Sequence, residues 1–553
     1  MNIPFITKYF ISRGGRQLYA MMRGYRILRA SNQLPRIMDT KISLTNHVLD
    51  IPLNKTSRFI FGAGILNAEL CVRQFLLVRS GGFSLNAALL KSLGNGEKPI
   101  AFHLPPIWRK ILASHGFTVS QFRSAMVWQG FVVACLGYGV IQILKNSINE
   151  FKSLFVKNKK VLGRHVYFIG LTKNELPKPG FDGKSYDVIS WYLQWPKKLS
   201  NLQSACHSVR GVSPTTLGKV AVVPIPKEPT LNRLNQLLNF VAWGLVATTI
   251  ATIDLLRGRW WHALMLSDAT RSCMVRLQDT SDLASEYLFH NSFASYRPLW
   301  TYEAESRGSQ VTFYFYSTNC EPFKNYNGYP PLPYSWQAMN WSRYLVWNEQ
   351  QADFIRRCVG SQANIEIVGP IWFSTTAAKL PSLPANLIAV FDIQPRRTSI
   401  YAGLGIPVEY YTPPICNQFI LDIHSLAVES NWIMAWKCKR KIGSAVHPSY
   451  NSMGLKLASS PNLISIDPDI AALSVIEASS IVISMPFTST ASIARSLGKP
   501  SYYYDPSGIV QKDDRAAHGI PVISGREELL QLFHSFVFEK SSSSNPECNM
   551  PNT

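Results

Sequence analysis

Three consecutive hydroxyl side chains, Thr488, Ser489 and Thr490, follow a strand-like apolar run near the C-terminal end of the chain. The run is IVIS at 481–484, a Met-Pro-Phe turn separates it from the hydroxyls, and a helical pattern begins directly after them. The first turn of a helix has unpaired backbone N–H groups and a partial positive charge, so hydroxyls placed there favour an anion such as phosphate. An ordinary N-cap needs the same residue types. On this stretch alone both interpretations stay open.

A basic stretch, KCKRKIGSAVHP, ends in a histidine that a proline follows. The run WIMAW before it predicts a strand, so the cations stand at a strand end and His447-Pro448 lies in the following loop. Such a histidine donates one hydrogen bond when neutral and adds charge when protonated. Together with the hydroxylated helix start, the stretch predicts a phosphate site at one edge of a sheet. Its predicted ligands are Lys437, Lys439, Arg440, His447, Pro448, Thr488, Ser489 and Thr490.

Four carboxylates are candidates for the remaining chemistry. Glu477, one helix before IVIS, is placed to accept hydrogen bonds from ribose hydroxyls, or it faces solvent. Glu303 and Glu305, in LWTYEAESRG, are predicted in a polar loop between strands. There one of them is a candidate general base, and a surface acidic pair explains them equally. Asp392 follows the apolar run LIAVF and is a further cleft candidate, or a cap of its loop.

Several chemistries have no support in the chain. There is no GxGxxG, no GxxxxGK[ST] and no GxSxG, so dinucleotide, P-loop and hydrolase sites are not indicated. The nine cysteines are scattered singly, and no histidine pair has metal-ligand spacing. We therefore expect no metal site and a reducing compartment.

Apolar runs alternate with short helical patterns along the C-terminal part, which predicts a parallel sheet covered on both faces. This indicates a Rossmann-like domain over 385–538, followed by a tail at 540–553 that we expect to be disordered. Strand-like runs also recur over 161–380, predicting a second α/β domain with an apolar helical insertion near 236–261. Residues 1–160 are predicted as a basic helical region that associates with membranes.

The charge balance and two uncharged stretches raise the question of a membrane. The net charge is +22 with a pI of about 9.6, which favours an anionic partner. Residues 1–36 alternate cations with apolar residues, as an interfacial helix or a helix packed on the protein does. The runs at 125–144 and 236–253 have the length of a membrane span, and buried or interfacial helices explain them as well. We expect no nucleic acid as a partner, because no binding motif accompanies the charge.

The Pro-Phe-Thr-Ser turn, the HP loop and the L-G-K-P and Y-D-P that follow resemble the bacterial polysaccharide-biosynthesis proteins named for a PFTS motif. The C-terminal half of that family is similar to glycosyltransferases of the GT-B type. The resemblance implies an α/β fold with two Rossmann-like domains facing a cleft, to which apolar and basic helices are added in the N-terminal half. It assigns His447, Ser489 and Thr490 to donor phosphates and places the general base in the N-terminal domain.

The activity that the resemblance implies is sugar transfer in surface polysaccharide biosynthesis, such as capsule or O-antigen. The donor would be a nucleotide-activated sugar, CMP- or CDP-activated among the options, with no other cofactor. The acceptor would be a glycan or a lipid-linked glycan, and the enzyme would be cytoplasmic and peripheral on an anionic membrane. The alternatives are a non-catalytic nucleotide-sugar-binding or scaffold protein of the same system, and a polyol-phosphate transferase of similar fold.

Overall fold

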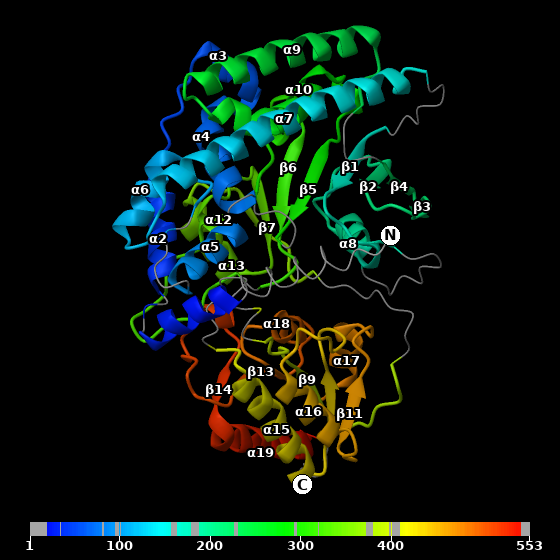
Figure 1. Ribbon diagram of the computed structural model, residues 1–553. Helices are drawn as coiled ribbons and strands as arrows, with labels where there is room; N and C mark the ends of the chain where they lie inside the picture. Colours follow the sequence, from blue (N-terminus) through cyan, green and yellow to red (C-terminus); the bar gives the residue numbers. More distant parts are fainter. Residues whose placement is uncertain are drawn as a thin grey trace, which may run out of the picture.

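The chain folds into two α/β domains stacked one above the other (Figure 1). The fold is that of a computed structural model. It describes residues 19–31, 33, 35–79, 82–94, 99, 101–155, 163–177, 187–225, 230–291, 296–318, 320–371, 380–397, 400 and 410–543. Each domain is built on one sheet, and the expectation of two Rossmann-like domains is confirmed.

The N-terminal domain has an eight-stranded sheet of order β3-β4-β2-β1-β5-β6-β7-β8. All neighbours are parallel except the edge pair β3–β4. The strands are β1 His165–Phe168, β2 Ser204–His207, β3 Thr215–Leu217, β4 Val220–Pro224, β5 Glu286–His290, β6 Gln310–Tyr314, β7 Arg343–Val346 and β8 Ile365–Ile367. Without β3, the order reverses direction between β1 and β5, which makes the carboxyl ends of these two strands the natural ligand crevice of this sheet.

A helical layer covers this sheet at the end far from the other domain (Figure 1). The helices of the domain are α2 Pro35–Asn46, α3 Lys55–Phe61, α4 Ala68–Gln74, α5 Gly82–Gly94, α6 Pro106–Ser114, α7 Gln121–Ser153, α8 Val188–Gln194, α9 Leu234–Leu256, α10 Trp261–Leu277, α11 Trp300–Ser306, α12 Tyr334–Gln337 and α13 Glu349–Val359. Short helical turns are η1 Gly62–Asn67, η2 Phe75–Arg79, η3 Lys173–Glu175 and η4 Thr280–Asp282. Helix α10 packs against both α7 and α9. One hydrophobic core joins residues of the first 160 positions to α9 and α10, and α11 links it to the core of the sheet through Tyr302 and Trp300.

The two uncharged stretches form most of α7 and α9, and the structure shows that neither is buried as a whole. In the most apolar 18-residue segment of each helix, only 22 % of α7 and 39 % of α9 is buried. Together with the helical run Lys55–Arg79, these are the segments of the described chain that are long and apolar enough to cross a membrane.

The C-terminal domain has a six-stranded, fully parallel sheet of order β11-β10-β9-β12-β13-β14. Its strands are β9 Leu387–Phe391, β10 Ile433–Lys437, β11 Leu463–Ile466, β12 Ile481–Ser484, β13 Ser501–Asp505 and β14 Val522–Ser524. Its helices are α15 Pro413–Glu429, α16 Pro448–Leu457, α17 Ala472–Ala478, α18 Ser489–Ser496 and α19 Gly525–Ser543, with the turn η5 Arg515–Ala517. This is the Rossmann strand order, and its direction reverses between β9 and β12. Strands β9 and β12 are completely buried, as their continuous apolar runs predict.

The C-terminal tail begins later than predicted. Helix α19 continues to Ser543, so residues 540–543 are helical, and the rest of the predicted tail lies outside the described residues. Half of the predicted N-terminal interfacial helix, residues 1–18, also lies outside them.

Candidate ligand site between the two sheets

The Pro-Phe-Thr-Ser turn lies at the reversal point of the C-terminal sheet, directly after β12. Phe487 has a left-handed backbone, with φ of +64°, which is strained for a residue with a side chain. Its ring holds it there: it packs 4.6 Å from the ring of Phe323 in the N-terminal domain and 5.7 Å from that of Tyr503. The hydroxyl of Tyr411 donates to the carbonyl of Pro486, 2.9 Å away. The motif therefore shapes the turn and ties the domains together.

The three hydroxyls of the turn have defined partners. Thr488, the N-cap of α18, donates to the carbonyl of Met485. Ser489 Oγ accepts from the backbone N–H of Thr318, at 3.0 Å, and from its hydroxyl, at 3.2 Å. Thr490 Oγ1 lies 3.1 Å from Ser484 Oγ. Because both acceptor positions of Ser489 Oγ are filled, its own hydrogen stays available for an anion at the start of α18.

Thr318 follows β6, and Ser489 follows β12. The hydrogen bond between them therefore joins the carboxyl edges of the two sheets. The first-turn N–H groups of α18 have no carbonyl four residues before them in the helix and lie at this same edge. An anion here would meet the positive end of the helix.

His447 lies at the start of α16, on the same edge of the C-terminal sheet. It is half-buried, and its Nδ1 caps the helix by accepting from the backbone N–H of Ser449. The backbone N–H of His447 donates to the carbonyl of Pro395 in the loop after β9. Because Nδ1 accepts a hydrogen bond, the proton of the neutral ring is on Nε2, which makes Nε2 a hydrogen-bond donor. Pro448 is exposed and occupies the first helical position, for which its fixed φ is suited.

The predicted basic ligands divide into a buried and an exposed group. Lys437 ends β10, is buried, and donates to the carbonyl of Pro468, 3.1 Å away. Burial lowers the pKa of its ammonium. Lys439 and Arg440 are exposed at the strand end. Only the exposed pair is therefore accessible to a ligand in the cleft.

Asp392 stands at the end of β9, as predicted, but it is 4 % exposed and faces inward. Its Oδ2 accepts from Trp436 Nε1, at 2.9 Å, and from the hydroxyl of Tyr450, while its Oδ1 has no partner in the described structure. Burial raises the pKa of this carboxyl to about 6. The geometry favours a role inside the domain over contact with a substrate.

The structure contradicts the placement of the other three carboxylates. Glu477 is exposed near the end of α17, just before β12 begins, so it lies at the amino edge of the sheet and faces solvent. Its carbonyl accepts from Lys499, which follows the last turn of α18, so it lies at the opposite end of α18 from the hydroxyl turn. Helices of such a sheet run antiparallel to the strands, which carries their last turn away from the ligand edge.

Glu303 and Glu305 do not lie in a loop but on helix α11. Glu303 is buried, and its Oε1 accepts from Arg276, at 2.7 Å, and from the backbone N–H of Ala63. Glu305 pairs with Arg297, at 2.7 Å. Both carboxylates therefore neutralise cations within the N-terminal domain.

The sequence analysis missed the residues at the reversal point of the N-terminal sheet. His290 ends β5, and its ring lies 5.6 Å from that of Tyr314 and 5.3 Å from that of Tyr316. Glu175 follows β1 and is half-exposed, and its Oε2 accepts from the backbone and hydroxyl of Thr172. The signal that could have found them is their position at the ends of strand-like runs, since His290 is near the end of SEYLFHN and Glu175 is in the loop after VYFIGL.

Charges from the two reversal points act on one tyrosine. Burial and the Glu175 carboxylate raise the pKa of the Tyr316 phenol, and the Arg440 guanidinium of the other domain lowers it. Burial lowers the pKa of His290, and Glu175 raises it. A carboxylate of one domain and a guanidinium of the other thus lie about the same aromatic group.

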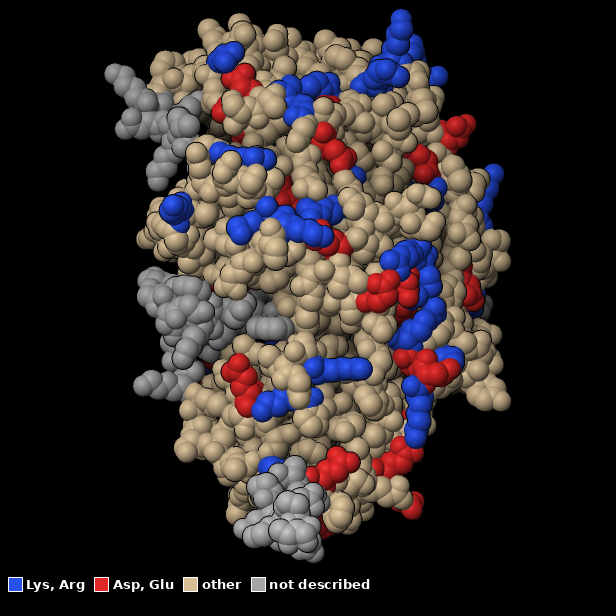
Figure 2. Space-filling view, turned by 180° about the vertical axis from the view of Figure 1, so that it is seen from behind, with Lys and Arg blue, Asp and Glu red and all other residues tan. Residues whose placement is uncertain are grey.

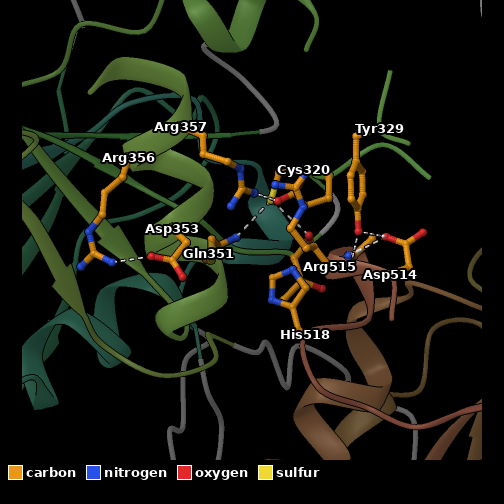
Figure 3. Close-up of polar contacts among 12 residues, drawn as sticks. Cys320, Tyr329, Gln351, Asp353, Arg356, Arg357, Asp514, Arg515 and His518 are labelled. Carbon is orange, nitrogen blue, oxygen red and sulfur yellow. Dashed lines mark hydrogen bonds and ion pairs between the residues drawn. The ribbon is translucent and has the colours of Figure 1, made fainter. Parts of the chain in front are cut away.

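A second junction fixes the domains beside the site, near α13 and η5 (Figure 3). The hydroxyl of Tyr329 donates to Asp514, 3.2 Å away, and the guanidinium of Arg515 lies 3.6 Å from the centre of the Tyr329 ring. His518 Nδ1 lies 3.0 Å from the side-chain oxygen of Asn348. Burial lowers the pKa of His518 to about 4, so its ring is neutral at pH 7.

The face of the molecule that is turned away in Figure 1 carries charges of both signs. Figure 2 shows Lys and Arg spread over both domains and interleaved with Asp and Glu. Among the described residues, no group of three or more histidines, cysteines and carboxylates is arranged to hold a metal ion.

Comparisons with known proteins give one family match and several distant structural similarities. The family model described as polysaccharide biosynthesis PFTS motif protein matches residues 243–533, just over half of the chain. No curated protein gave a significant match. Among solved structures, a Listeria monocytogenes protein assigned as a UDP-N-acetylglucosamine 2-epimerase is 12 % identical, over 69 % of this chain and 89 % of that one, with a TM-score of 0.34.

Two further solved structures are similar at the same low level. Sucrose-phosphate synthase from Thermosynechococcus elongatus is 8 % identical, over 68 % of this chain and 90 % of that one, with a TM-score of 0.34. TarM is 12 % identical, over 48 % of this chain and 52 % of that one, with a TM-score of 0.28.

Proposed function

The chain belongs to the polysaccharide biosynthesis PFTS motif family, and from this premise we propose that it is a glycosyltransferase that moves a sugar from a nucleotide-activated donor to a glycan or lipid-linked acceptor. The observation that carries the proposal is the meeting of two reversal points. The C-terminal one offers hydrogen-bond donors and cations, and the N-terminal one offers a carboxylate. Donor and acceptor chemistry would then face each other across one cleft.

The donor phosphates would bind at the start of α18. The first-turn N–H groups, the free O–H of Ser489 and the Nε2–H of His447 would receive the phosphate oxygens, with Arg440 adding charge. As the bond between the sugar carbon and the phosphate oxygen breaks, negative charge grows on the leaving phosphate. The same donors would stabilise it there. A CMP- or CDP-activated sugar is within the class of donors that we propose.

Glu175 would act as the general base, in place of the carboxylates that the structure places elsewhere. The acceptor hydroxyl oxygen would form the new bond to the sugar carbon while its proton passes to the carboxylate. Oε2 of Glu175 accepts two hydrogen bonds from Thr172, which orient the carboxylate, and Oε1 would take the proton. His290, buried and neutral, would pack beneath the acceptor side of the site, against Tyr314 and Tyr316.

We also propose that the enzyme works on the cytoplasmic side of a membrane in surface polysaccharide assembly. The family description supports the assignment to polysaccharide assembly, and the apolar helices α7 and α9 support association with a membrane. The free cysteines of the described chain fit a reducing compartment.

Nucleotide binding tests the donor site directly. CMP, CDP, UDP and GDP are added in turn to the purified chain, and the melting temperature is followed. We expect one of them to raise it, and His447→Ala to weaken its binding at least fivefold. His534→Ala, an exposed histidine of the same domain, is the matched control and should change nothing. If no nucleotide raises the melting temperature, or if both variants bind like the wild type, the donor-site assignment fails.

A further inference from the structure

Helices α7 and α9 present an apolar face to the outside of the N-terminal domain. On α7, Val127 and Tyr138 are exposed elsewhere on the helix, but most exposed apolar residues recur three, four, seven or eight positions apart and so lie on one side. They are Phe122, Met126, Val133, Ile141, Leu144, Ile148 and Phe151, and on α9 the corresponding residues are Leu238, Leu245, Val246, Ile253 and Leu256. Ile141 is 59 % exposed and Leu245 is 68 % exposed. We call this surface the α7–α9 face. An unpartnered apolar surface that extends over two long helices is typical of an interaction site.

The outward charges of the two helices are all of one sign. The acidic residues of the two helices, Glu150 and Asp254, are each 5 % exposed and point inward. Glu150 accepts from the backbone N–H of Leu231, at 2.6 Å, and Asp254 pairs with His262, at 2.7 Å. The outward charges are cations that form no ion pair with another described residue: Arg123, Lys145, Lys152 and Arg257. A face whose large exposed side chains are apolar and whose exposed charges are cations is complementary to an anionic, apolar partner.

Two threonine hydroxyls on α9 donate hydrogen bonds within their own helix and need no water as a partner. Thr249 Oγ1 donates to the carbonyl of Leu245, at 3.0 Å, and Thr252 Oγ1 to that of Thr248, at 2.8 Å. Both threonines are exposed, so water could serve them in solution. Bonds to the helix's own carbonyls allow the same hydroxyls to face a medium that offers no partners.

We propose that the α7–α9 face lies in the interface of an anionic lipid membrane, with both helices parallel to the membrane plane. The apolar side chains would enter the acyl boundary, and the cations would contact the headgroups. Lipid is favoured over a protein partner because the charge pattern is uniform along the face rather than patterned for one complementary surface.

The topology favours helices that lie on the membrane over helices that cross it. Strand β1 follows α7, strand β5 follows α10, and β1 and β5 pair directly in one sheet. If α7 and α9 both crossed, α10 would have to cross back to reach β5. Helix α10 carries Asp268, Arg271 and Arg276, and Asp268 is paired with Arg79, so such a crossing would place several charged groups in the bilayer.

This orientation leaves the ligand cleft free. Helix α9 lies at the end of the N-terminal domain farthest from the C-terminal domain (Figure 1). Membrane binding should therefore be independent of the nucleotide, and His447→Ala should bind vesicles as the wild type does. The two proposals can thus fail separately.

Co-sedimentation of the purified full chain with vesicles tests the proposal. One set of vesicles contains only phosphatidylcholine, and the other contains an added third of phosphatidylglycerol. We expect binding to the anionic vesicles to be at least tenfold stronger and to weaken with salt. The double variant Ile141→Gln/Leu245→Gln should lose at least tenfold in binding, and Lys145→Gln/Lys152→Gln at least threefold. The matched control is Leu455→Gln/Ile509→Gln, which removes two equally exposed apolar residues from the C-terminal domain and should leave binding unchanged. Melting temperatures confirm that the variants fold.

Three results would overturn the proposal. The first is equal vesicle binding by the wild type and Ile141→Gln/Leu245→Gln. The second is a dimer in solution that this double variant converts to a monomer, since the face would then bind a second copy. The third is retention in cell membranes after washing at high salt and alkaline pH, which would show spanning helices.

Discussion

The sheets of the two domains reverse direction in the same way, between β1 and β5 in one and between β9 and β12 in the other, yet their charges are used in opposite ways. In the N-terminal domain, Glu303 and Glu305 form ion pairs with arginines inside the fold. In the C-terminal domain, Lys439 and Arg440 stay exposed at the ligand edge. The comparison shows that sheet topology determines where a site lies, while the partners of each charge determine what remains available for chemistry.

The outer helices differ as well. Exposed large apolar residues are scattered singly over the C-terminal domain, but they line one face of α7 and α9 in the N-terminal domain. We interpret this as a division of roles, with the acceptor and membrane on one side and the donor on the other. The following predictions test that division.

The largest expected effect is on turnover, from Glu175→Gln. Loss of a general base should lower kcat at least 100-fold, because positioned proton transfer contributes about 10²–10⁴ in rate. Nucleotide binding, measured by the shift in melting temperature, should be unchanged because the donor site lies in the other domain. Glu477→Gln, at the wrong edge for either role, is the control and should retain full turnover. Normal turnover by Glu175→Gln would show that this carboxylate is not the general base and that the N-terminal domain does not activate the acceptor through it.

Glu303→Gln should affect stability rather than chemistry. It leaves Arg276 without its carboxylate in a largely buried pair, which we expect to lower the free energy of unfolding by about 2–3 kcal/mol. Urea denaturation measures the change. Glu349→Gln removes an exposed pair with Arg356 and should cost at most about 0.5 kcal/mol. A stable but inactive Glu303→Gln would instead support the role predicted from the sequence.

Acid should weaken the junction of Figure 3 through His518. Its pKa is about 4 in the folded protein and 6.5 without perturbation, so the unfolded chain binds the proton more readily between these values. Stability from this group is complete above pH 6.5 and is lost as the pH falls toward 4, by about 3 kcal/mol in total.

The measurement is the difference in unfolding free energy between the wild type and His518→Asn from pH 7 to pH 4. Asn suits the left-handed backbone at this position, where φ is +49°, and cannot titrate. Buried Asp392, whose pKa of about 6 is raised from 3.8, gives the opposite slope, but it is present in both proteins and cancels. Parallel pH profiles for the two proteins would contradict this assignment.

The smallest expected effect is from Ser489→Ala. It removes the acceptor of the Thr318 N–H and should lower the free energy of unfolding by about 1–2 kcal/mol. If Ser489 also binds phosphate, nucleotide affinity should fall several-fold. The control is Ser496→Ala, whose hydroxyl bonds only to its own helix. A loss of affinity without a loss of stability would mean that the bond across the domains contributes little.

Much of the fold was predictable because buried parallel strands are continuous apolar runs. LIAVF, IVIS and SYYYD are strands at the predicted places, and the predicted helix near 415–430 is α15. The strands β2, β3 and β14 were not identified, because SACH and TTL hold few large apolar residues and VIS follows a proline. The loop predicted for LWTYEAESRG is helix α11, because its aromatic residues and Ala304 pack inward and tertiary contacts outweigh local polarity.

The site was predictable only in part. The hydroxyl turn and His447 lie on the same sheet edge, as their positions after strands indicate, and their role as ligands stays a prediction. Glu477 was misplaced because the rule of strand ends was applied to a helix end. Glu175 and His290 were overlooked because nothing in their local sequence distinguishes them from loop residues.

The sequence by itself determined the alternation of strands and helices, the apolar composition of α7 and α9, and the family. Only the tertiary structure decided which charges are available. Ion pairs such as Arg276–Glu303 join residues from different elements, and local sequence does not encode them. It also decided that the Phe487 ring and Ser489 reach across to the N-terminal domain, and that α7 and α9 turn their apolar sides outward. Pairing and exposure depend on distances between segments that are far apart in the chain, and packing alone fixes those distances.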